Sequence, residues 1–441
     1  MRMNSLLKEY EIREREPLFG DTKTDILIIG GGIAGILLAR ELEDRGADCL
    51  LVEGKRIAGG VTGGTTGKIT AQHGLIYSKI IKEKGMGAAG KYYAANAEAV
   101  EKYKKICGNG GIDCDFEISD SYVFSKDAEK IAEEYKTLEA VGADTEINHD
   151  LPDFIKAAGG KAAVGIKNQA MFHVRKFIGG VSEGLNIREN TFVRKIDKNI
   201  AFTDNGKIQF RRAVIATHFP IINHLGLYFV KMYQFRTYLA ATECDLRLPG
   251  MFVDEADGGM TFRRHGNLLV YGGGGHKTGK KGDCRAFRSF AARNLPGCAE
   301  KYCWAAQDCM SHDGVPYIGR YSPFSDNLYV ITGFNKWGIS SSMVSAGLVS
   351  DLLEGKRNKY EELFSPSRFF LGKNFFVNLA NSAAGLVTPT VPRCPHMGCA
   401  LKKNLLEGTW DCPCHGSRFT TDGKLIDNPS VRNMKRARKD K

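Results

Sequence analysis

The stretch "TDILIIGGGIAGILLARELEDRGADCLLVEG" at residues 24–54 constrains the fold more than any other part of the chain. It opens with an apolar run, 26–29, of the length of a buried strand, and passes through glycines into a helical pattern over 33–45. A second short apolar run, 49–52, follows. This order predicts a strand–helix–strand unit of Rossmann type, so we expect an α/β protein.

Each part of this unit has a task in binding a dinucleotide. Gly30, Gly32 and Gly35 stand in G-x-G-x-x-G spacing, which allows a tight turn, close approach to a pyrophosphate and close helix–strand packing. The helix N-terminus, with Ala34 in its first turn, presents free N–H groups to the phosphates. Glu53 can accept hydrogen bonds from a ribose diol, which favours FAD or NAD over NADP.

The segment "IAGGVTGGTTGKITAQHG" at residues 57–74 favours FAD over NAD. It is rich in glycine and threonine, and its backbone, including Gly60 and Thr62, can run past the ribityl chain and ring of a flavin. A flexible loop is the alternative interpretation of the same residues.

Two later segments are typical of the same kind of domain. Residues 327–355 predict a strand, a turn and a helix, with Gly333 and Gly338 beside the turn and Ile339 at the start of the helix. Residues 211–217 predict a further strand of the sheet. A plain strand–turn–helix unit without a ligand is the alternative for the first segment.

Four of the twelve cysteines lie close together near the C-terminus, whereas the others are scattered and are interpreted as reduced thiols. Cys394 and His396 form C-x-H, and Cys412 and His415 form C-x-x-H after fifteen intervening residues. Two cysteines and two histidines suit a Rieske [2Fe-2S] cluster, with the cysteines on one iron and the histidines on the other. A structural zinc ion and unrelated thiols are the alternatives.

The glycine motif, "VIATH" (214–218), "DGVPYIGR" (313–320) and "TGFNKWG" (332–338) together resemble the D-amino-acid oxidase/glycine oxidase (DAO) group of FAD-dependent oxidoreductases. The resemblance implies a discontinuous Rossmann-like FAD-binding domain with an inserted mixed α+β substrate domain, and places Val193 near the adenine. The expected division is an N-terminal extension at 1–19, the FAD-binding domain at 20–80, 165–225 and 305–360, and the substrate domain at 81–164 and 226–304.

"TGKITAQHGLIY" and "GFNKWG" are similar to a bacterial subgroup that carries a Rieske domain behind the flavoprotein. We therefore expect a linker at 361–385, a small all-β Rieske module at 386–430 and a basic tail at 431–441. Little sequence separates the flavoprotein from Cys394, so we expect the module to be shortened.

The Rieske resemblance also implies roles for residues beside the cluster ligands. Cys399 and Cys414 correspond to a disulfide between the two cluster loops, and Ser417 to a donor of a hydrogen bond to a cluster sulfur. Phe419 stands where members of high potential carry a tyrosine. A phenylalanine cannot donate, so we expect a lower potential, within the Rieske range of about −150 to +300 mV.

The family resemblance implies oxidation of an amine or amino acid, with electrons passing from flavin to cluster and then to an external acceptor, which can be a protein. Lys68 and His73 are candidate residues near the flavin, and Arg236 is a candidate partner for a substrate carboxylate. One alternative is an electron-transfer or reductase component without an amine substrate. Another is a flavin-binding protein with a structural or vestigial metal module.

Charge and hydropathy bound the remaining possibilities. The net charge is +12, and the basic residues at 431–441 are interpreted as a solvated tail; we expect no nucleic-acid partner. The N-terminus has no apolar signal region, and no apolar run is long enough to span a bilayer. We therefore expect a cytoplasmic protein.

Overall fold

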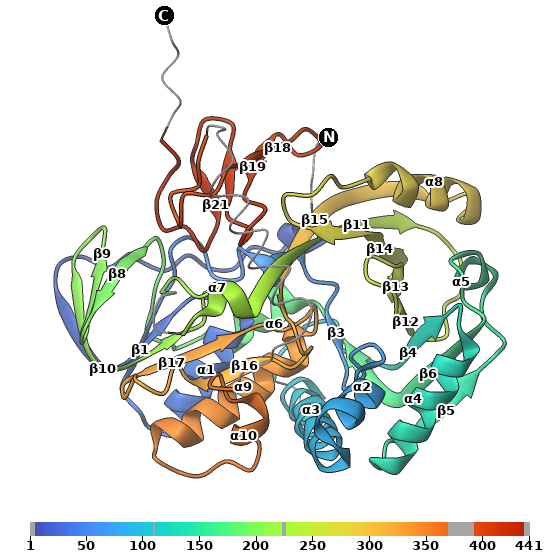
Figure 1. Cartoon of the computed structure of the whole chain (residues 1–441), viewed down its shortest axis with the longest axis horizontal. Helices are drawn as coiled ribbons and strands as arrows, with labels where there is room; N and C mark the ends of the chain where they lie inside the picture. Colours follow the sequence, from blue (N-terminus) through green and yellow to red (C-terminus); the bar gives the residue numbers. More distant parts are fainter. Residues whose placement is uncertain (1–4, 109–110, 223–225, 369–391, 436–441) are drawn as a thin grey trace, which may run out of the picture.

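The computed structural model describes residues 5–108, 111–222, 226–368 and 392–435. Within them the chain forms two large sheets and one small sheet (Figure 1). Of the predicted linker, the structure describes only its first residues, including the short helix α10 (Glu361–Phe364). Residues 436–441 of the predicted tail also lie outside the described residues.

The first large sheet contains the predicted Rossmann unit. Its strands are β1 (Thr22–Ile29), β2 (Cys49–Val52), β7 (Ile187–Arg188), β8 (Val193–Asp197), β9 (Ile200–Thr203), β10 (Lys207–Ile215), β16 (Tyr317–Arg320) and β17 (Leu328–Thr332). They run in the order β16-β17-β10-β1-β2-β7, and β8 and β9 form a hairpin beside β10. The neighbours from β17 to β7 pair in parallel, which is the arrangement that a Rossmann unit requires.

Helices α1 (Ile33–Asp44) and α9 (Gly338–Leu353) cover one face of this sheet. Ile26 and Ile28 of β1 lie in the core with these helices, whereas Leu27 and Ile29 lie in a second core with residues of β9 and β10. Successive side chains of a strand point to opposite faces, so the apolar run can fill both cores. The predicted strand–helix–strand unit is confirmed.

The second large sheet has nine strands in the order β15-β11-β14-β13-β12-β4-β6-β3, with β5 paired to β6. Their bounds are β3 (Lys68–Ile69), β4 (Glu117–Ser125), β5 (Thr145–Asn148), β6 (Ala162–Met171), β11 (Met232–Glu243), β12 (Met251–Asp254), β13 (Thr261–His265), β14 (Leu268–Lys277) and β15 (Ala299–Ser311). Strand β6 extends past residue 165, where we expected the FAD-binding domain to resume; the predicted domain boundaries stay predictions.

Further helices surround the two sheets. They are the 3-10 helices η1 (Leu6–Glu9) and η2 (Val61–Gly64), and α2 (Ile76–Lys84), α3 (Met86–Gly108), α4 (Ala128–Ala140), α5 (Asp153–Ala157), α6 (Val174–Val181), α7 (Tyr228–Lys231) and α8 (Cys284–Asn294). None of the helices in the described part of the chain has both the length and the apolar character of a membrane span.

The ribbon of β11 and β15 has a different neighbour on each face. Tyr238 and Ala240 pack in a core with Phe287 of α8. Leu239 and Trp304 face the other way and pack against Leu6 of the N-terminal segment. One face of the ribbon is thus turned toward the glycine-rich part of the chain and the other away from it.

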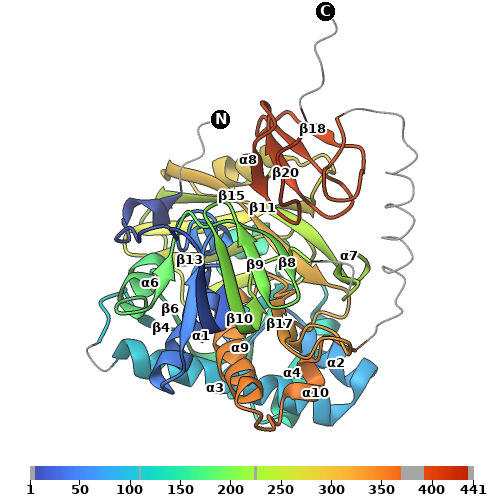
Figure 2. The same cartoon turned by 90° about the vertical axis from the view of Figure 1, so that its left-hand side faces the viewer.

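The third sheet is a small antiparallel one formed by β18 (Lys402–Asn404), β19 (Thr409–Asp411), β20 (Arg418–Thr420) and β21 (Leu425–Asp427). Its core consists of cysteines together with Leu401, Phe419 and Met434. Both views show this unit lying over β11 and β15 (Figures 1 and 2). The expected α/β architecture with a separate all-β C-terminal unit is confirmed.

Candidate functional site

The glycine turn after β1 brings three segments of backbone into close contact. Gly30 has a φ of 117°, and a Cβ atom there would lie 2.4 Å from the carbonyl oxygen of Ala216, just beyond β10. A Cβ atom on Gly35 would lie 1.9 Å from the carbonyl oxygen of Gly30. The N-terminus of α1 is therefore held close to the ends of β1 and β10.

The start of α1 faces the loop after β2. Ile33 N donates to Thr62 Oγ1 over 3.1 Å, and the same hydroxyl is the one atom near a Cβ position on Gly32. Gly60 has no atom within 4 Å of its Cβ position, and Ala34 is buried in the first helical turn. Open glycine backbone at a helix N-terminus fits the pyrophosphate of a dinucleotide.

Glu53 follows β2 and is oriented by backbone donors. Gly31 N donates to Oε2 over 2.7 Å, and Lys55 N donates to Oε1 over 2.8 Å. Burial raises the pKa of Glu53, and these hydrogen bonds oppose the shift. Each carboxylate oxygen keeps a lone pair that can accept from a ribose hydroxyl, so the residue fits the predicted contact.

The other predicted cofactor residues lie on two further segments. Gly333 follows β17 and Gly338 begins α9, while the carbonyl of Ile339 accepts a hydrogen bond from Tyr103 over 2.9 Å. Val193 begins β8, which pairs with β9 at the side of the first sheet. The contact of each residue with the cofactor stays a prediction.

His73 is enclosed by hydrogen-bonding groups. Its Nδ1 lies 2.7 Å from the hydroxyl of Tyr92, and its Nε2 lies 2.9 Å from the carbonyl oxygen of Thr70 and 2.8 Å from Ser340 Oγ. The ring also stacks on Trp337 with centroids 5.0 Å apart. Burial lowers the pKa of His73 to about 3, so the imidazole is neutral and ties α3 and α9 to the loop.

Lys68 is a buried amine rather than a surface cation. Its Nζ donates to the carbonyl oxygen of Phe252 over 2.9 Å and to Thr261 Oγ1 over 2.6 Å. Burial lowers the pKa of Lys68 well below its ordinary value, and the charge of Arg263 adds to the shift. Lys68 therefore joins β3 to the middle of the second sheet, and its catalytic role stays a prediction.

Among the predicted site residues, Arg236 has the surroundings that differ most from those expected. Its guanidinium forms two hydrogen bonds with the carboxylate of Glu407 in the C-terminal unit, and both side chains are almost fully buried. The groups that we expected to bind a substrate carboxylate are thus occupied by a carboxylate of the protein itself. The physical reason is that β11 faces the C-terminal unit at this position.

Asp308 is a half-buried acid for which the sequence alone gave no expectation. It lies on β15, four residues after Trp304 and hence on the same face of the strand. Trp304 Nε1 donates to the carbonyl oxygen of Gly64 over 2.9 Å, so this face meets the glycine-rich loop. Burial raises the pKa of Asp308 to about 6, and the charge of Lys336 opposes the shift.

Lys336 lies in the turn before α9 and faces Asp308. Its φ of 72° is left-handed, and its Nζ lies 4.4 Å from the centroid of the Phe235 ring. Among the described residues neither Asp308 nor Lys336 forms a direct ion pair. The available signal in the sequence was two adjacent polar residues, Gln307 and Asp308, within the apolar stretch 302–310.

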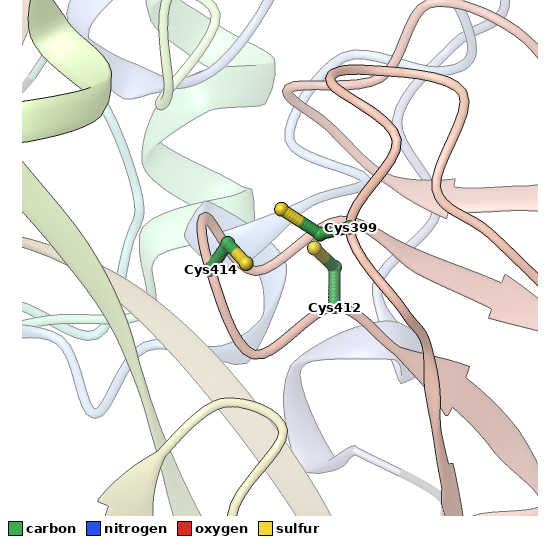
Figure 3. A group of neighbouring side chains, drawn as sticks. All are labelled: Cys399, Cys412 and Cys414. Carbon is green, nitrogen blue, oxygen red and sulfur yellow. The ribbon is translucent and has the colours of Figure 1, made fainter. Parts of the chain in front are cut away.

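The four cysteines of the C-terminal unit lie close together, and two of them, Cys394 and Cys412, are predicted cluster ligands. The thiol of Cys412 is within hydrogen-bonding reach of Cys394, Cys399 and Cys414, and all four side chains are buried. Figure 3 shows three of them, Cys399, Cys412 and Cys414, gathered where two loops meet; their sulfur atoms lie within 4.8 Å of one another. The described residues contain no disulfide bond, so the predicted Cys399–Cys414 pairing stays a prediction.

The two histidines complete this group. The rings of His396 and His415 lie 5.1 Å apart at their centroids, and neither ring nitrogen of His415 makes a hydrogen bond of normal geometry, although both are buried. Ser417 forms a side-chain hydrogen bond with Cys394. Two thiols and two imidazoles are the donor set of a Rieske cluster, so the residue types present fit this group, and their roles as ligands stay predictions.

The fold and these two sites define a flavoprotein with an iron–sulfur module behind it, and comparison with known proteins agrees. Residues 25–352 match the family model of FAD dependent oxidoreductases (DAO), and residues 354–438 match that of the Rieske [2Fe-2S] domain. The chain is 32% identical to YhfW of Bacillus subtilis (strain 168), described as a Rieske 2Fe-2S iron-sulfur protein, over 94% of this chain and 93% of the relative.

Solved structures show the same fold at low sequence identity. L-proline dehydrogenase from P. horikoshii is 20% identical with a TM-score of 0.65, over 80% of this chain and 98% of that one. L-amino acid deaminase from Proteus vulgaris is 16% identical with a TM-score of 0.65, over 82% of this chain and 100% of that one.

The chain belongs to the DAO family of FAD-dependent oxidoreductases and carries a C-terminal Rieske domain. Its cofactors are FAD and a [2Fe-2S] cluster. The match to the Rieske domain therefore favours the iron–sulfur cluster over a structural zinc ion. The protein is an enzyme of the oxidoreductase class.

Proposed function

We propose that the enzyme oxidises the C–N bond of an amine or amino acid and delivers the electrons through its Rieske cluster to an external acceptor. When bound, FAD takes a hydride equivalent from the C–H bond beside nitrogen, and the cluster takes electrons singly. The observation that carries this proposal is the contact of the second cluster loop with one face of β11 and β15. The opposite face of the same two strands meets the glycine-rich loop.

Asp308 supports an amine as the substrate. An ionised carboxylate in a half-buried place attracts an ammonium group and accepts its N–H hydrogen bonds. Lys336 beside it suits a substrate carboxylate or another electron-rich group. This pair therefore takes the part of substrate recognition that we had expected of Arg236.

An electron-transfer component without an amine substrate is the second candidate. It is favoured by one observation, the occupation of Arg236 by Glu407, which removes the expected binding group for an amino-acid carboxylate. In this case the electrons would reach the flavin from a partner and not from a C–H bond.

Anaerobic mixing of the holoenzyme with a panel of amines and amino acids separates the two candidates. We expect at least one compound to bleach the flavin absorbance, followed by the paramagnetic signal of the reduced cluster. Cys412→Ser serves as the control, because it should lose iron yet keep the flavin bleaching. A flavin that no amine reduces, but that a reduced carrier protein does reduce, would support the second candidate instead.

We further propose that the enzyme acts in the cytoplasm with a protein as electron acceptor. The absence of a membrane-spanning helix in the described residues is compatible with this location. Cell fractionation with an antibody against the chain tests it, and recovery of the protein in a washed membrane fraction would contradict it.

A further inference from the structure

The two faces of the β11–β15 ribbon separate the flavin side of the molecule from the cluster side. Arg236 lies directly opposite Gln307, and Phe235 lies directly opposite Asp308. Directly opposed residues of antiparallel strands share a face, and the next pair along points the other way. Gln307 therefore faces the Rieske module, whereas Asp308 faces the glycine-rich loop.

Two buried glutamines on the Rieske side bind the second cluster loop. Gln307 Nε2 donates to the carbonyl oxygen of Gly416 over 3.0 Å and to Gln234 Oε1 over 2.5 Å. Gln234 Nε2 donates to the carbonyl oxygen of His415 over 2.9 Å. Both side chains are at most 3% exposed, so these hydrogen bonds are shielded from water.

The contact is also close at the level of the backbone. Gly416 has a φ of 84°, and a Cβ atom there would lie 2.6 Å from the Cβ of Gln234. Thr278 Oγ1 donates to Gln307 Oε1 over 2.9 Å and fixes the orientation of the amide. The loop is therefore seated directly on the strand, with no side chain between them.

The two histidine ligands differ in their surroundings. His415 is 1% exposed and lies between the rings of Phe219 and Phe229, with centroid distances of 6.4 Å and 5.9 Å. His396 is half-buried, next to the exposed Met397. The His415 side of the centre thus faces the flavoprotein, and the His396 side faces outward.

We infer that Gln234 and Gln307 are positioning residues that hold the His415 loop against β11 and β15 and so provide the route by which electrons cross from the flavin side to the cluster. The inference rests on the proposed function. The reduced flavin would supply one electron to the cluster, where one of the two ferric ions would become ferrous. The cluster would have to pass this electron to the acceptor before it could take the second electron of the flavin. Electron transfer falls steeply with distance, and the two amides keep the His415 loop in direct contact with β11 and β15.

The test uses the purified holoprotein and reduces the flavin with a light flash and EDTA as electron donor, so that no amine substrate is needed. Gln307→Glu keeps the size of the side chain but replaces the donor of both hydrogen bonds by an acceptor. We expect the paramagnetic signal of the reduced cluster to form about tenfold more slowly, which equals roughly 1.4 kcal/mol of activation free energy.

Three measurements distinguish positioning from loss of the centre. Iron and sulfide per chain should match those of the wild type, since the ligands are untouched. The midpoint potential is measured as well, so that a change in driving force is separated from a change in the position of the loop. Gln209→Glu on the exposed face of β10 is the matched control and should leave the rate unchanged. If Gln307→Glu loses iron, the uncharged Gln307→Met replaces it in the comparison.

The outcomes separate this inference from the proposed function. A wild-type cluster that stays oxidised after its flavin is reduced would contradict both. A wild-type cluster that is reduced, together with loaded Gln307→Glu and Gln307→Met variants that react equally fast, would overturn the inference and leave the proposed function standing.

Discussion

At the scale of the residue, Asp308 is a half-buried acid on the face of β15 that meets the glycine-rich loop. Its pKa rises from an ordinary 3.8 to about 6, chiefly through burial. The folded chain therefore binds more protons than the unfolded chain in this interval, and its stability falls as the pH rises from 3.8 to about 6. The affinity for a substrate ammonium group rises over the same pH interval, because this contact needs the ionised carboxylate of Asp308.

We expect kcat/KM for an amine substrate to fall as the pH drops through about 6. Asp308→Asn should remove this limb of the profile and lower kcat/KM at neutral pH by about tenfold or more, since a hydrogen bond to a charged group contributes ~1.5–3 kcal/mol. The same variant should raise Tm at neutral pH and have little effect near pH 4. Equal Tm values for both proteins at neutral pH would argue against the raised pKa.

Phe419 is fully buried on β20, next to the cluster loops. Phe419→Tyr supplies a hydroxyl that can donate to a cluster sulfur and stabilise the reduced state. We expect the midpoint potential to rise by about 60 mV, which is a tenfold change for one electron. Potentiometric titration of the paramagnetic signal measures it, with the exposed Phe324→Tyr as control. An unchanged potential in a loaded variant would show that the hydroxyl does not reach the cluster.

At the scale of the element, the FAD site depends on how closely α1 approaches β1 and β10. The approach is set by backbone and not by side chains, because the Gly35 position lies against the Gly30 carbonyl oxygen. A larger residue must move the helix, and with it the N–H groups that we predict to face the pyrophosphate.

Gly35→Ala should therefore abolish or strongly reduce flavin binding, measured as FAD per chain after purification. The matched control is Gly90→Ala in α3, where no atom lies within 4 Å of the Cβ position. Alanine is preferred to glycine in a helix by about 0.8–1 kcal/mol, so the control should be at least as stable as the wild type. A Gly35→Ala protein with full FAD content would refute the close packing described for this turn.

At the scale of the whole molecule, a buried ionic network fastens the Rieske module to the flavoprotein. Glu407 is bound by Arg236 of β11 and by Arg418 of its own unit, and Arg418 also pairs with Asp411 and Asp427. Burial opposes ionisation of Glu407, but the two arginines outweigh it and lower its pKa. This contribution to stability is therefore present above the ordinary pKa of a glutamate and is lost as the pH falls below it.

Removing one partner of a buried ion pair typically costs about 3–5 kcal/mol. We expect Arg236→Met to reach the lower end of this range, because Glu407 keeps Arg418. Urea unfolding followed by the visible absorbance of the cluster measures the loss. Arg285→Met is the control, since that side chain is 83% exposed and should change stability by no more than ~0.5 kcal/mol. Identical midpoints for Arg236→Met and the wild type would mean that the network does not hold the module.

The FAD-binding unit and the two cluster loops could be predicted, because the sequence patterns that indicate them are local. The strand, glycine turn and helix at residues 24–54 depend on spacing within one short stretch, and the two cluster loops on spacing within another. The role of Arg236 could not be predicted in the same way, because its partner lies 171 residues away. The roles of His73 and Lys68 near the flavin stay predictions, and the hydrogen-bond partners of both residues come from distant elements.

The sequence by itself determined the family and both cofactors, because binding backbone and metal ligands are encoded as short motifs. The residues that these motifs assign to each cofactor stay predictions. Only the tertiary structure decided which polar side chains face the flavin side and which face the cluster. That choice depends on the pairing of β11 with β15 and on buried charges finding partners far along the chain. Local spacing carries no information about such pairings, since they follow from burial in the folded molecule.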